Sequence, residues 1–578
     1  MKQYMKTLLF CVATSVLLSS CGEDFLYKAP QGSIDSEALA NGEGVDLLVV
    51  NAYATLLSTE HKWGSSIFNW TFGGMYGGDA NKGSDNNDQS VLNSMEVYTL
   101  LATNSYLDEK WNWVYIGSKR VAQALDLASK ADDMDAKLKA IRMGELYFIR
   151  AVCYFEGVKV FGPNIPYIDE VQHAADNNPK VKNDRNIYPE ILADVDRAIS
   201  SLPDKPDAVG RAYSWAAKAL KAKILMQQGE MAQAKSLLQD VIENGTTATG
   251  KKYALANDLT DNWDSYRDNT SPESIFEIQF SADGNNNGNQ GMSLCYPHNT
   301  GAPGGCCGFY QPSYELANSY KVDANGLPFL NNEYRTGKSI SDDAAQTVDP
   351  RLDFTMGRTG IPYKDYGPAL DGWIRDKNNG GVFLPKKHVY SKAEGDAGLG
   401  RGNMSGNWAP GSAMNIQYLS VRDAMLLYAE CLANDSELSK AMGLVNQIRK
   451  RAGLDVNVIR QENGTPAATY KVSEYPSSHA AFSDKATCIK AVRMERKLEL
   501  AMEGSRWFDL VRWGGDYMAQ QLNDYIDYER KFLGKFAGAS KLPATKTMFP
   551  IPQNQIDMMG NDESGQPYLV QSAVWATK

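Results

Sequence analysis

The chain has 578 residues, of which 43% are hydrophobic and 22% charged, the composition of a large globular protein. Its formal net charge of −10 argues against nucleic acid as a partner, because phosphates attract basic surfaces. With only five histidines, the sequence offers little material for histidine-based catalysis or a zinc site.

The first 20 residues have the pattern of a signal peptide. Two lysines precede an apolar run, Leu8 to Leu18, that is too short for a membrane span. Small residues before Cys21 resemble the lipobox of bacterial lipoproteins. We therefore expect residues 1–20 to be removed and Cys21 to carry acyl chains that anchor the protein to a membrane. The alternative is ordinary cleavage that leaves a free cysteine.

Four long helices are expected in the N-terminal half, after a polar tether at residues 21–44. Apolar residues recur there every three or four positions, the period of a helix with one buried face. Glycine or proline ends the last two of these segments. The expected helices are Val45–Leu57, Tyr106–Lys130, Ala140–Phe161 and Tyr188–Leu202.

Two further segments carry the spacing of small and apolar residues seen in tetratricopeptide repeats, where paired antiparallel helices pack closely. The positions are Ala222, Leu225, Gly229, Ala234, Leu238 and Val241, and then Ala429, Leu432, Ala441, Val445 and Ile448. Ordinary antiparallel helix packing is the alternative. We predict a mostly α fold, a tetratricopeptide-like helical scaffold with long ordered loops and a few short strands. Its two parts, residues 45–270 and 271–578, should form one globular unit.

Loops rich in Gly, Asn and aromatic residues interrupt the helical pattern at residues 63–90 and 296–408. Loops this long in a compact protein usually have a function. We predict that they form a ligand-binding platform, with aromatic rings as stacking faces and polar side chains beside them. The candidates are Trp70, Tyr76, Tyr296, Trp373 and Trp408 as stacking faces, and Asp79, Asn81 and Arg375 as polar partners. For each tryptophan, core packing is the alternative.

Two motifs resemble known binding loops and depart from them. The segment Gly245–Lys252 nearly fits the phosphate-binding pattern, but Lys252 replaces the hydroxyl that would hold magnesium. The run Asp283, Asn285, Asn287, Gly288 begins like a calcium loop, but Leu294 replaces its bidentate glutamate. Neither a serine-hydrolase elbow nor a zinc-protease motif occurs. We expect no catalytic residue, no cofactor and no metal; a weak structural calcium ion is the alternative.

Three cysteines lie in one loop, and their spacing fits no standard zinc framework. In an oxidising compartment we expect Cys295 to form a disulfide with either Cys306 or Cys307, and the sequence does not choose between them. Free thiols are the alternative.

The run Ile489–Gly514 predicts a long helix followed by an aromatic turn, with charges among core-type residues. Such charges must be paired, because an unpaired buried charge costs several kcal/mol. We predict an ion-pair network, with a catalytic carboxylate pair as the alternative. The residues proposed for it are Glu499, Glu503, Arg506, Asp509 and Arg512.

The segment Arg496–Gly514 has the pattern R-x-x-E-L-x-x-E-G-x-R-W-F-D-L-x-R-W-G, which resembles the C-terminal signature of the SusD/RagB family. That family consists of nutrient-binding outer-membrane lipoproteins of the Bacteroidota. Further matches occur at residues 145–166, 349–352, 418–433, 445–454 and 549–556. The resemblance covers nearly the whole mature chain. The acids at positions 23 and 24 also resemble the surface-export signal of such lipoproteins.

This resemblance implies a surface lipoprotein, not an enzyme, that captures a nutrient and passes it to a SusC-like TonB-dependent outer-membrane transporter. A glycan or oligosaccharide is the expected ligand, because sugars need aromatic faces and amide or charged groups, which the loops supply. A surface glycoside hydrolase and a helical scaffold that binds peptides or proteins are the alternatives.

Overall fold

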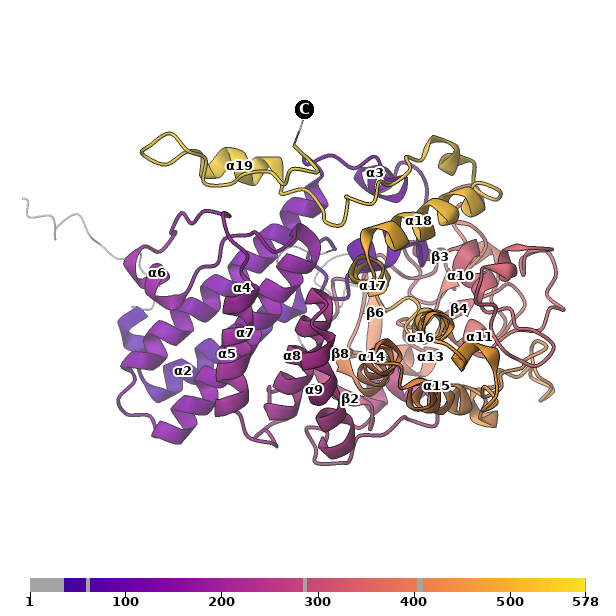
Figure 1. Ribbon diagram of the computed structural model, residues 1–578, viewed down its shortest axis with the longest axis horizontal. Coiled ribbons are helices and arrows are strands. Elements are labelled where there is room, and N and C mark those ends of the chain that lie inside the picture. Colours follow the sequence, from indigo (N-terminus) through magenta and orange to yellow (C-terminus); the bar gives the residue numbers. More distant parts are fainter. Residues whose placement is uncertain (1–35, 59–62, 284–287, 403–408, 577–578) are drawn as a thin grey trace, which may run out of the picture.

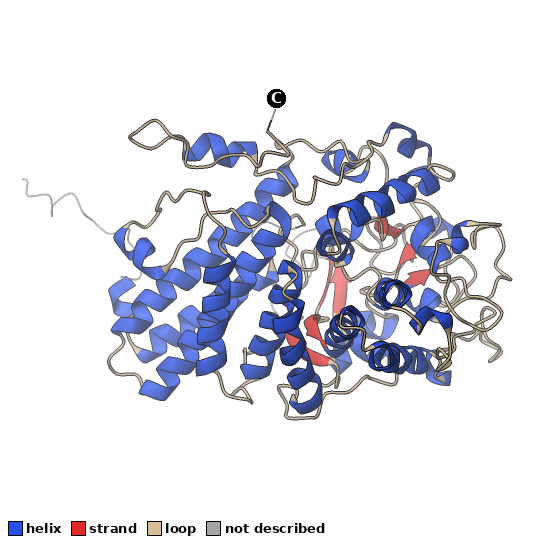
Figure 2. Cartoon of the chain, in the orientation of Figure 1, coloured by secondary structure: helices blue, strands red, loops and turns tan. Residues whose placement is uncertain are grey.

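The computed structural model describes residues 36–58, 63–283, 288–402 and 409–576. The predicted lipidation site Cys21, the candidate Trp408 and the middle of the calcium-like motif lie outside the described residues. Helices make up most of the fold, and short strands lie among them (Figure 2). Within the described ranges, no helix has the length and apolar character needed to cross a bilayer.

The N-terminal helices stand side by side in one half of the molecule (Figure 1). Contacts run from α2 to α4, from α4 to α5, and onward through α7 and α8 to α9. Side-chain caps start several of them; for example, Asp135 accepts hydrogen bonds from the first N–H groups of α5. Their bounds are α2 Gly42–Ala54, α3 Val91–Glu96, α4 Ser105–Lys130, α5 Ala136–Phe161, α6 Glu170–Ala175, α7 Tyr188–Ser201, α8 Ser214–Gln228 and α9 Met231–Asn244.

The row of helices continues into the C-terminal half, because α9 packs against α14, and α14 packs against α15 and α16. The apolar residues predicted from the repeat spacing are buried in both helical pairs. Gly229 ends α8 with a left-handed backbone, φ 82°, which glycine adopts without strain. The mostly α scaffold is thereby confirmed. The later helices are α14 Val421–Asn434, α15 Leu438–Ala452, α16 Lys485–Glu499, α17 Arg506–Arg512, α18 Gly515–Glu529 and α19 Gln553–Met559.

Short strands fix the loops between the helices. They pair antiparallel as β1–β3, β2–β8, β4–β5 and β6–β7. The strands are β1 Ala80–Gly83, β2 Ser274–Ile278, β3 Phe309–Pro312, β4 Met356–Gly357, β5 Leu384–Pro385, β6 Gly400–Gly402, β7 Pro410–Ser412 and β8 Ile416–Ser420. The short helices are α10 Tyr314–Ser319, α11 Arg351–Thr355, α12 Lys377–Gly380 and α13 Lys392–Asp396. The β1–β3 pair joins the two loop regions that the sequence singled out, with Gly83 opposite Phe309.

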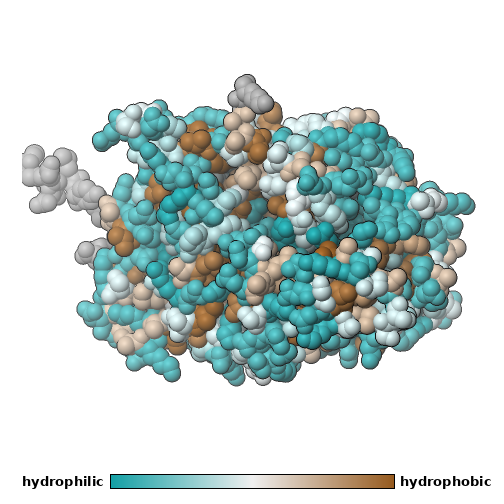
Figure 3. Space-filling model, viewed as in Figure 1, coloured by the Kyte–Doolittle hydropathy of each residue, from teal (hydrophilic) through white to brown (hydrophobic). Residues whose placement is uncertain are grey.

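One hydrophobic cluster extends through both halves of the chain, from Val45 in α2 to Trp507 in α17 and Phe549 beyond α18. On the face shown in Figure 3, hydrophilic residues predominate and apolar residues lie in small separate patches. Because the cluster contains residues from both predicted parts, 45–270 and 271–578, the two parts share buried contacts.

The run 489–514, predicted as a long helix followed by an aromatic turn, contains a helix, a turn and a second, aromatic helix. Helix α16 ends at Glu499 and α17 begins at Arg506, and the intervening turn contains Met502 with φ 63° and Gly504 with φ 70°. A Cβ added at Gly504 would lie 1.8 Å from the carbonyl oxygen of Phe68. The chain leaves the helix because this turn packs directly against the backbone near Phe68, which only glycine permits.

The predicted ion-pair network exists and is larger than expected. Arg351 is bidentate to Asp349 and also contacts Glu495 at 2.7 Å and Glu499 at 2.9 Å. The further pairs are Arg449–Glu495, Arg451–Glu499, Arg451–Glu273, Arg422–Glu273, Arg422–Glu503, Arg496–Asp423, Arg496–Asp509, Arg512–Asp509 and Arg512–Glu430. We call this set the arginine–carboxylate network. Buried charges of both signs satisfy one another across α11, α14, α15, α16, α17 and Glu273, the residue before β2.

Arg506, which was predicted to belong to the network, is not part of it. Its guanidinium lies 5.6 Å from the ring of Trp513, and no carboxylate of the described residues lies within ion-pair distance of it. Arg496 and Arg512 bind Asp509 instead. The error arises because helical spacing identifies a face but not which side chains on it meet.

The predicted disulfide of Cys295 is also wrong. Cys306 and Cys307 form a disulfide with each other, and Cys295 is a free, fully buried thiol. Cys295 lies in the hydrophobic core, where burial raises the pKa of its thiol. Residues 245–252 directly follow the end of α9 and form a turn, closed by a bridge between Thr246 and Lys252.

Candidate functional site

Two of the predicted stacking residues are core residues. Trp70 has no exposed surface; its indole N–H donates to the carbonyl of Gly291 at 3.0 Å, and its ring meets Tyr106, Phe309 and Tyr310 edge-on. Tyr76 is 2% exposed and is surrounded by other aromatic rings. Neither ring presents a face to solvent, so the expectation of exposed stacking faces is wrong for both.

The polar candidates Asp79 and Asn81 are buried as well. Asp79 accepts a hydrogen bond from the N–H of Met502 at 3.1 Å, and burial, opposed by the charge of Arg506, raises its pKa to about 6. Asn81 lies on β1 and donates to Glu529 at 3.3 Å. These two residues connect the loop region to the C-terminal helices and do not face solvent.

Tyr296 and Trp373 belong to a small hydrophobic cluster beneath the second loop region. Tyr296 is 1% exposed and Trp373 5%, so the expectation of an exposed stacking face is wrong for these two rings as well. Arg375 differs from the other described candidates, because 30% of its side chain is accessible to solvent. It is the predicted residue that reaches the surface.

Arg375 joins the two loop regions. Its guanidinium contacts Asp85 and Asp88, each at 2.6 Å, and the hydroxyl of Ser84 at 2.8 Å. Asn299, also in the second loop region, lies close to this segment, because its side chain donates to the carbonyl of Gly372 at 2.6 Å. We call the surface formed by residues 84–88, 298–308 and 371–377 the Arg375 surface.

The strand pair β1–β3 and a glycine position this surface. The N–H of Ser84 donates to the carbonyl of Gly308 at 2.5 Å, directly beyond the end of the paired strands. Gly308 has φ 81°, and a Cβ there would lie 3.3 Å from the Cβ of Arg375 and 3.4 Å from that of His298. The glycine therefore lets all three segments meet.

The Arg375 surface offers donors and acceptors for a polar ligand. Asn86, Asn87 and Asn299 are exposed, and the Asp85 and Asp88 carboxylates are partly accessible. Burial slightly opposes ionisation of Asp85, but hydrogen bonds from the N–H groups of Asn87 and Asp88, together with Arg375, keep its pKa below the usual value. This carboxylate is therefore an acceptor at neutral pH.

Sequence reasoning missed Asp85, Asp88, His298 and Asn299. An Asn- and Asp-rich run directly after a short strand was the available signal for the first two. His298 is half-buried, and desolvation together with the charge of Arg375 lowers its pKa. Its Nδ1 atom is buried and has no hydrogen-bond partner among the described residues.

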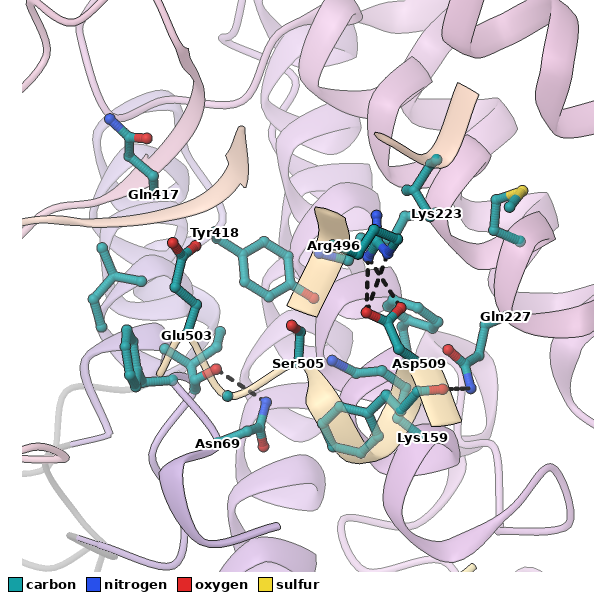
Figure 4. A pocket seen from close by; sticks show the side chains of 18 of the residues that line it. Asn69, Lys159, Lys223, Gln227, Gln417, Tyr418, Arg496, Glu503, Ser505 and Asp509 are labelled. Atoms are coloured by element: carbon teal, nitrogen blue, oxygen red, sulfur yellow. Dashed lines mark hydrogen bonds and ion pairs between the residues drawn. The ribbon is translucent and has the colours of Figure 1, made fainter. Parts of the chain in front are cut away.

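An internal cavity lies between the N-terminal helices and the C-terminal half (Figure 4). Its volume is about 80 Å³, well below the several hundred Å³ of small-molecule sites. The charges around it are paired: Lys159 contacts Glu156 at 2.6 Å, and Arg496 binds Asp509. This space fits a few water molecules and no sugar ring.

A larger cleft of about 400 Å³ has Trp263 and Phe354 in its walls, together with lysines and carboxylates. Two of its polar groups are bound to backbone: Lys386 donates to the carbonyls of Asp353 and Pro362, and Glu394 accepts from the N–H groups of Ser265 and Ser391. This cleft has the size of a ligand site, and it is the second candidate on the described surface.

Residues 272–575 match the SusD family, and residues 24–226 match a family described as starch-binding and associating with the outer membrane. A SusD-like protein of Bacteroides ovatus is 23% identical over 557 residues, which cover 91% of this chain and 86% of the relative. A SusD superfamily protein from Bacteroides vulgatus has the same fold, with a TM-score of 0.66, 20% identity, and coverage of 92% of this chain and 99% of that one.

A second solved structure, surface glycan-binding protein A from Bacteroides thetaiotaomicron in complex with laminarihexaose, has a TM-score of 0.63 at 19% identity. The alignment covers 92% of this chain and 99% of that one. The sequence match alone extends over more than half of the residues, and the fold agrees along nearly all of the chain. The chain belongs to the SusD family.

Proposed function

We propose that this protein is a cell-surface lipoprotein that binds a glycan and delivers it to a TonB-dependent outer-membrane transporter. Support comes from the family descriptions, which name starch binding and outer-membrane association, and from the similar protein whose structure holds laminarihexaose. The acyl anchor is proposed at Cys21, after the lipobox-like sequence. A SusC-like transporter is the proposed partner.

The observation that carries the binding proposal is the convergence of two distant loop regions at Arg375. Its guanidinium, the Asp85 and Asp88 carboxylates and the Asn299 amide provide donors and acceptors within one solvent-facing patch. Sugar hydroxyls both donate and accept, so they match a surface that carries both kinds of group. The strand pair beneath holds these groups in place before ligand arrives, which lowers the entropy cost of binding.

Binding without cleavage fits the electrostatics of this patch. A glycosidase needs one protonated carboxyl and one carboxylate on opposite sides of the sugar bond. Here Asp85 and Asp88 both contact the guanidinium of Arg375. For Asp85, two backbone N–H groups and this positive charge outweigh the effect of burial and lower its pKa. Asp85 is therefore poorly suited to be the protonated carboxyl of such a pair.

The test is to measure affinity of the purified mature chain for laminarin, starch and other polysaccharides by calorimetry. We expect Arg375→Ala to weaken binding roughly 30-fold, the effect of losing a central contact worth about 2 kcal/mol. Its melting temperature should change little, because exposed ion pairs contribute little stability. The control is Arg197→Ala on α7, which removes a remote, exposed arginine.

Several outcomes would contradict this assignment. Full affinity in Arg375→Ala, with loss in Arg460→Ala, would move the site to the larger cleft, which Arg460 lines. Shortened oligosaccharides after incubation would show a hydrolase. Binding of peptides but of no glycan would favour the scaffold alternative. If the protein does not co-purify with any TonB-dependent transporter from membranes, the proposed delivery to such a transporter is wrong.

A further inference from the structure

We propose that the disulfide between Cys306 and Cys307 is the apolar contact face for a sugar ring at the Arg375 surface. This inference rests on the proposed glycan binding and specifies how that site holds its ligand. It assigns a binding role to two adjacent cysteines that the sequence pattern left unexplained.

The disulfide lies within the loop that completes the Arg375 surface. Cys307 is 1% exposed, and its N–H donates to the carbonyl of Leu294 at 3.4 Å, so this half is fixed to the core. Cys306 is only partly buried. The next residue but one after Cys306 is Gly308, which packs against Arg375 and His298. Cys307 is thus anchored, and Cys306, which also packs against the core, stays partly exposed in the same segment as His298 and Asn299.

A structural role explains this disulfide poorly. A cross-link stabilises a fold mainly by closing a loop in the unfolded chain, and its effect grows with the length of that loop. Between adjacent residues the loop is the smallest that can exist. The bond also joins no two secondary-structure elements, so its position in the ligand-binding loop calls for another purpose.

The Arg375 surface needs an apolar face that no aromatic ring provides. Pyranose rings carry C–H groups that pack on apolar surfaces while their hydroxyls form hydrogen bonds. The segments 84–88, 298–308 and 371–377 contain one Trp, Tyr or Phe residue, Trp373, and it is 5% exposed. A disulfide is apolar and polarizable, and sulfur makes favourable packing contacts. The bond also holds both cysteine side chains in one arrangement, so little freedom is lost on binding.

Leu370 is the competing apolar group, because it is 54% exposed next to residue 371. It projects from a chain segment without a covalent constraint, whereas the disulfide is held by the core through Cys307. Leu370→Ala therefore serves as the matched comparison for the disulfide.

The experiment uses the purified mature chain and a glycan that it binds, found in the panel above. Affinity is measured for the oxidised protein, for the same protein after reduction, and for the double variant Cys306→Ala/Cys307→Ala. We expect both changes to weaken binding roughly 10-fold or more while the melting temperature stays within about 2 °C. We also expect the bound glycan to slow reduction of the disulfide, followed by labelling of the new thiols.

The outcomes separate this inference from the proposed function. If the wild-type chain binds no glycan, the proposed function fails and this inference fails with it. If the wild type binds and Arg375→Ala does not, but reduction and the double variant leave affinity unchanged, the glycan site stands and the disulfide contact is refuted. Loss of affinity only in Leu370→Ala assigns the apolar face to Leu370. Loss that accompanies a large fall in melting temperature shows a structural bond and also refutes the contact.

Discussion

Replacing Arg512 by alanine should destabilise the fold far more than the same change at Arg506, although both arginines belong to the seven-residue helix α17. Arg512 donates to both carboxylate oxygens of Glu430, at 2.6 and 2.8 Å, and to Asp509 at 2.8 Å. Its side chain is 3% exposed, and that of Glu430 is 4% exposed. Loss of the guanidinium leaves the Glu430 charge buried with a hydrogen bond from Trp513 and without its bidentate cation.

We expect Arg512→Ala to lower the free energy of unfolding by about 3–5 kcal/mol, the cost of breaking a buried ion pair. Unfolding entropy of about 2 cal/mol/K per residue amounts to roughly 1.2 kcal/mol/K for a mature chain of this size. The melting temperature of Arg512→Ala should therefore fall by about 3–4 °C. Arg506→Ala removes a guanidinium that stacks on Trp513 and should cost less than half as much.

Calorimetric melting of the wild type and both variants at one pH and salt concentration measures the difference. Adding Glu430→Gln to Arg512→Ala should recover part of the loss, because a buried amide costs less than a buried, unpaired charge. Equal shifts for Arg506→Ala and Arg512→Ala, or no recovery in the double variant, would show that these charges are solvated and that the burial argument is wrong.

Three further predictions concern the anchor, a buried carboxyl and the core. Cys21→Ala should move the protein out of the membrane fraction, and fatty-acid labelling of the variant would disprove the anchor. Burial raises the pKa of Glu529 from 4.5 to about 8, so its contribution to stability is complete below pH 4.5 and is lost as pH rises toward 8. Glu529→Gln should therefore flatten the decline of melting temperature between pH 5 and 8; an unchanged slope would show that Glu529 is ionised at little cost. Trp70→Ala should destabilise by about 3–5 kcal/mol, and lost glycan affinity at an unchanged melting temperature would show an exposed ring after all.

The helices were predictable because their signal is periodic. Ala222, Leu238 and Val445 follow from spacing alone, and each is buried as expected. The end of α16 could not be predicted from the sequence. The turn at 500–505 contains one glycine and no proline, and its position is determined by a contact with the distant Phe68. Local sequence carries no information about such a partner.

The candidate site was predicted at the level of regions rather than residues. Glycine- and asparagine-rich segments marked the two loop regions that meet at the Arg375 surface, and Arg375, chosen as a polar partner, is partly accessible to solvent. For Trp70 and Trp373 the surrounding composition suggested exposure, but these loops wrap around their own aromatic core. Burial of a loop tryptophan depends on strands that pair across more than 200 residues, such as Gly83 with Phe309.

The arginine–carboxylate network has a consequence for how members of this fold can diverge. Each central group serves several partners, so Glu495 holds Arg351 and Arg449, and Glu499 holds Arg351 and Arg451. A charge-changing substitution at one of these glutamates therefore removes an ion pair from two arginines at once. Such a change is tolerated only together with compensating changes at the partner residues. Among the described residues, no ion pair connects the Arg375 surface to this network. Its loops can therefore exchange residues, and with them the ligand preference that we propose for this surface, while the ionic centre of the scaffold stays the same.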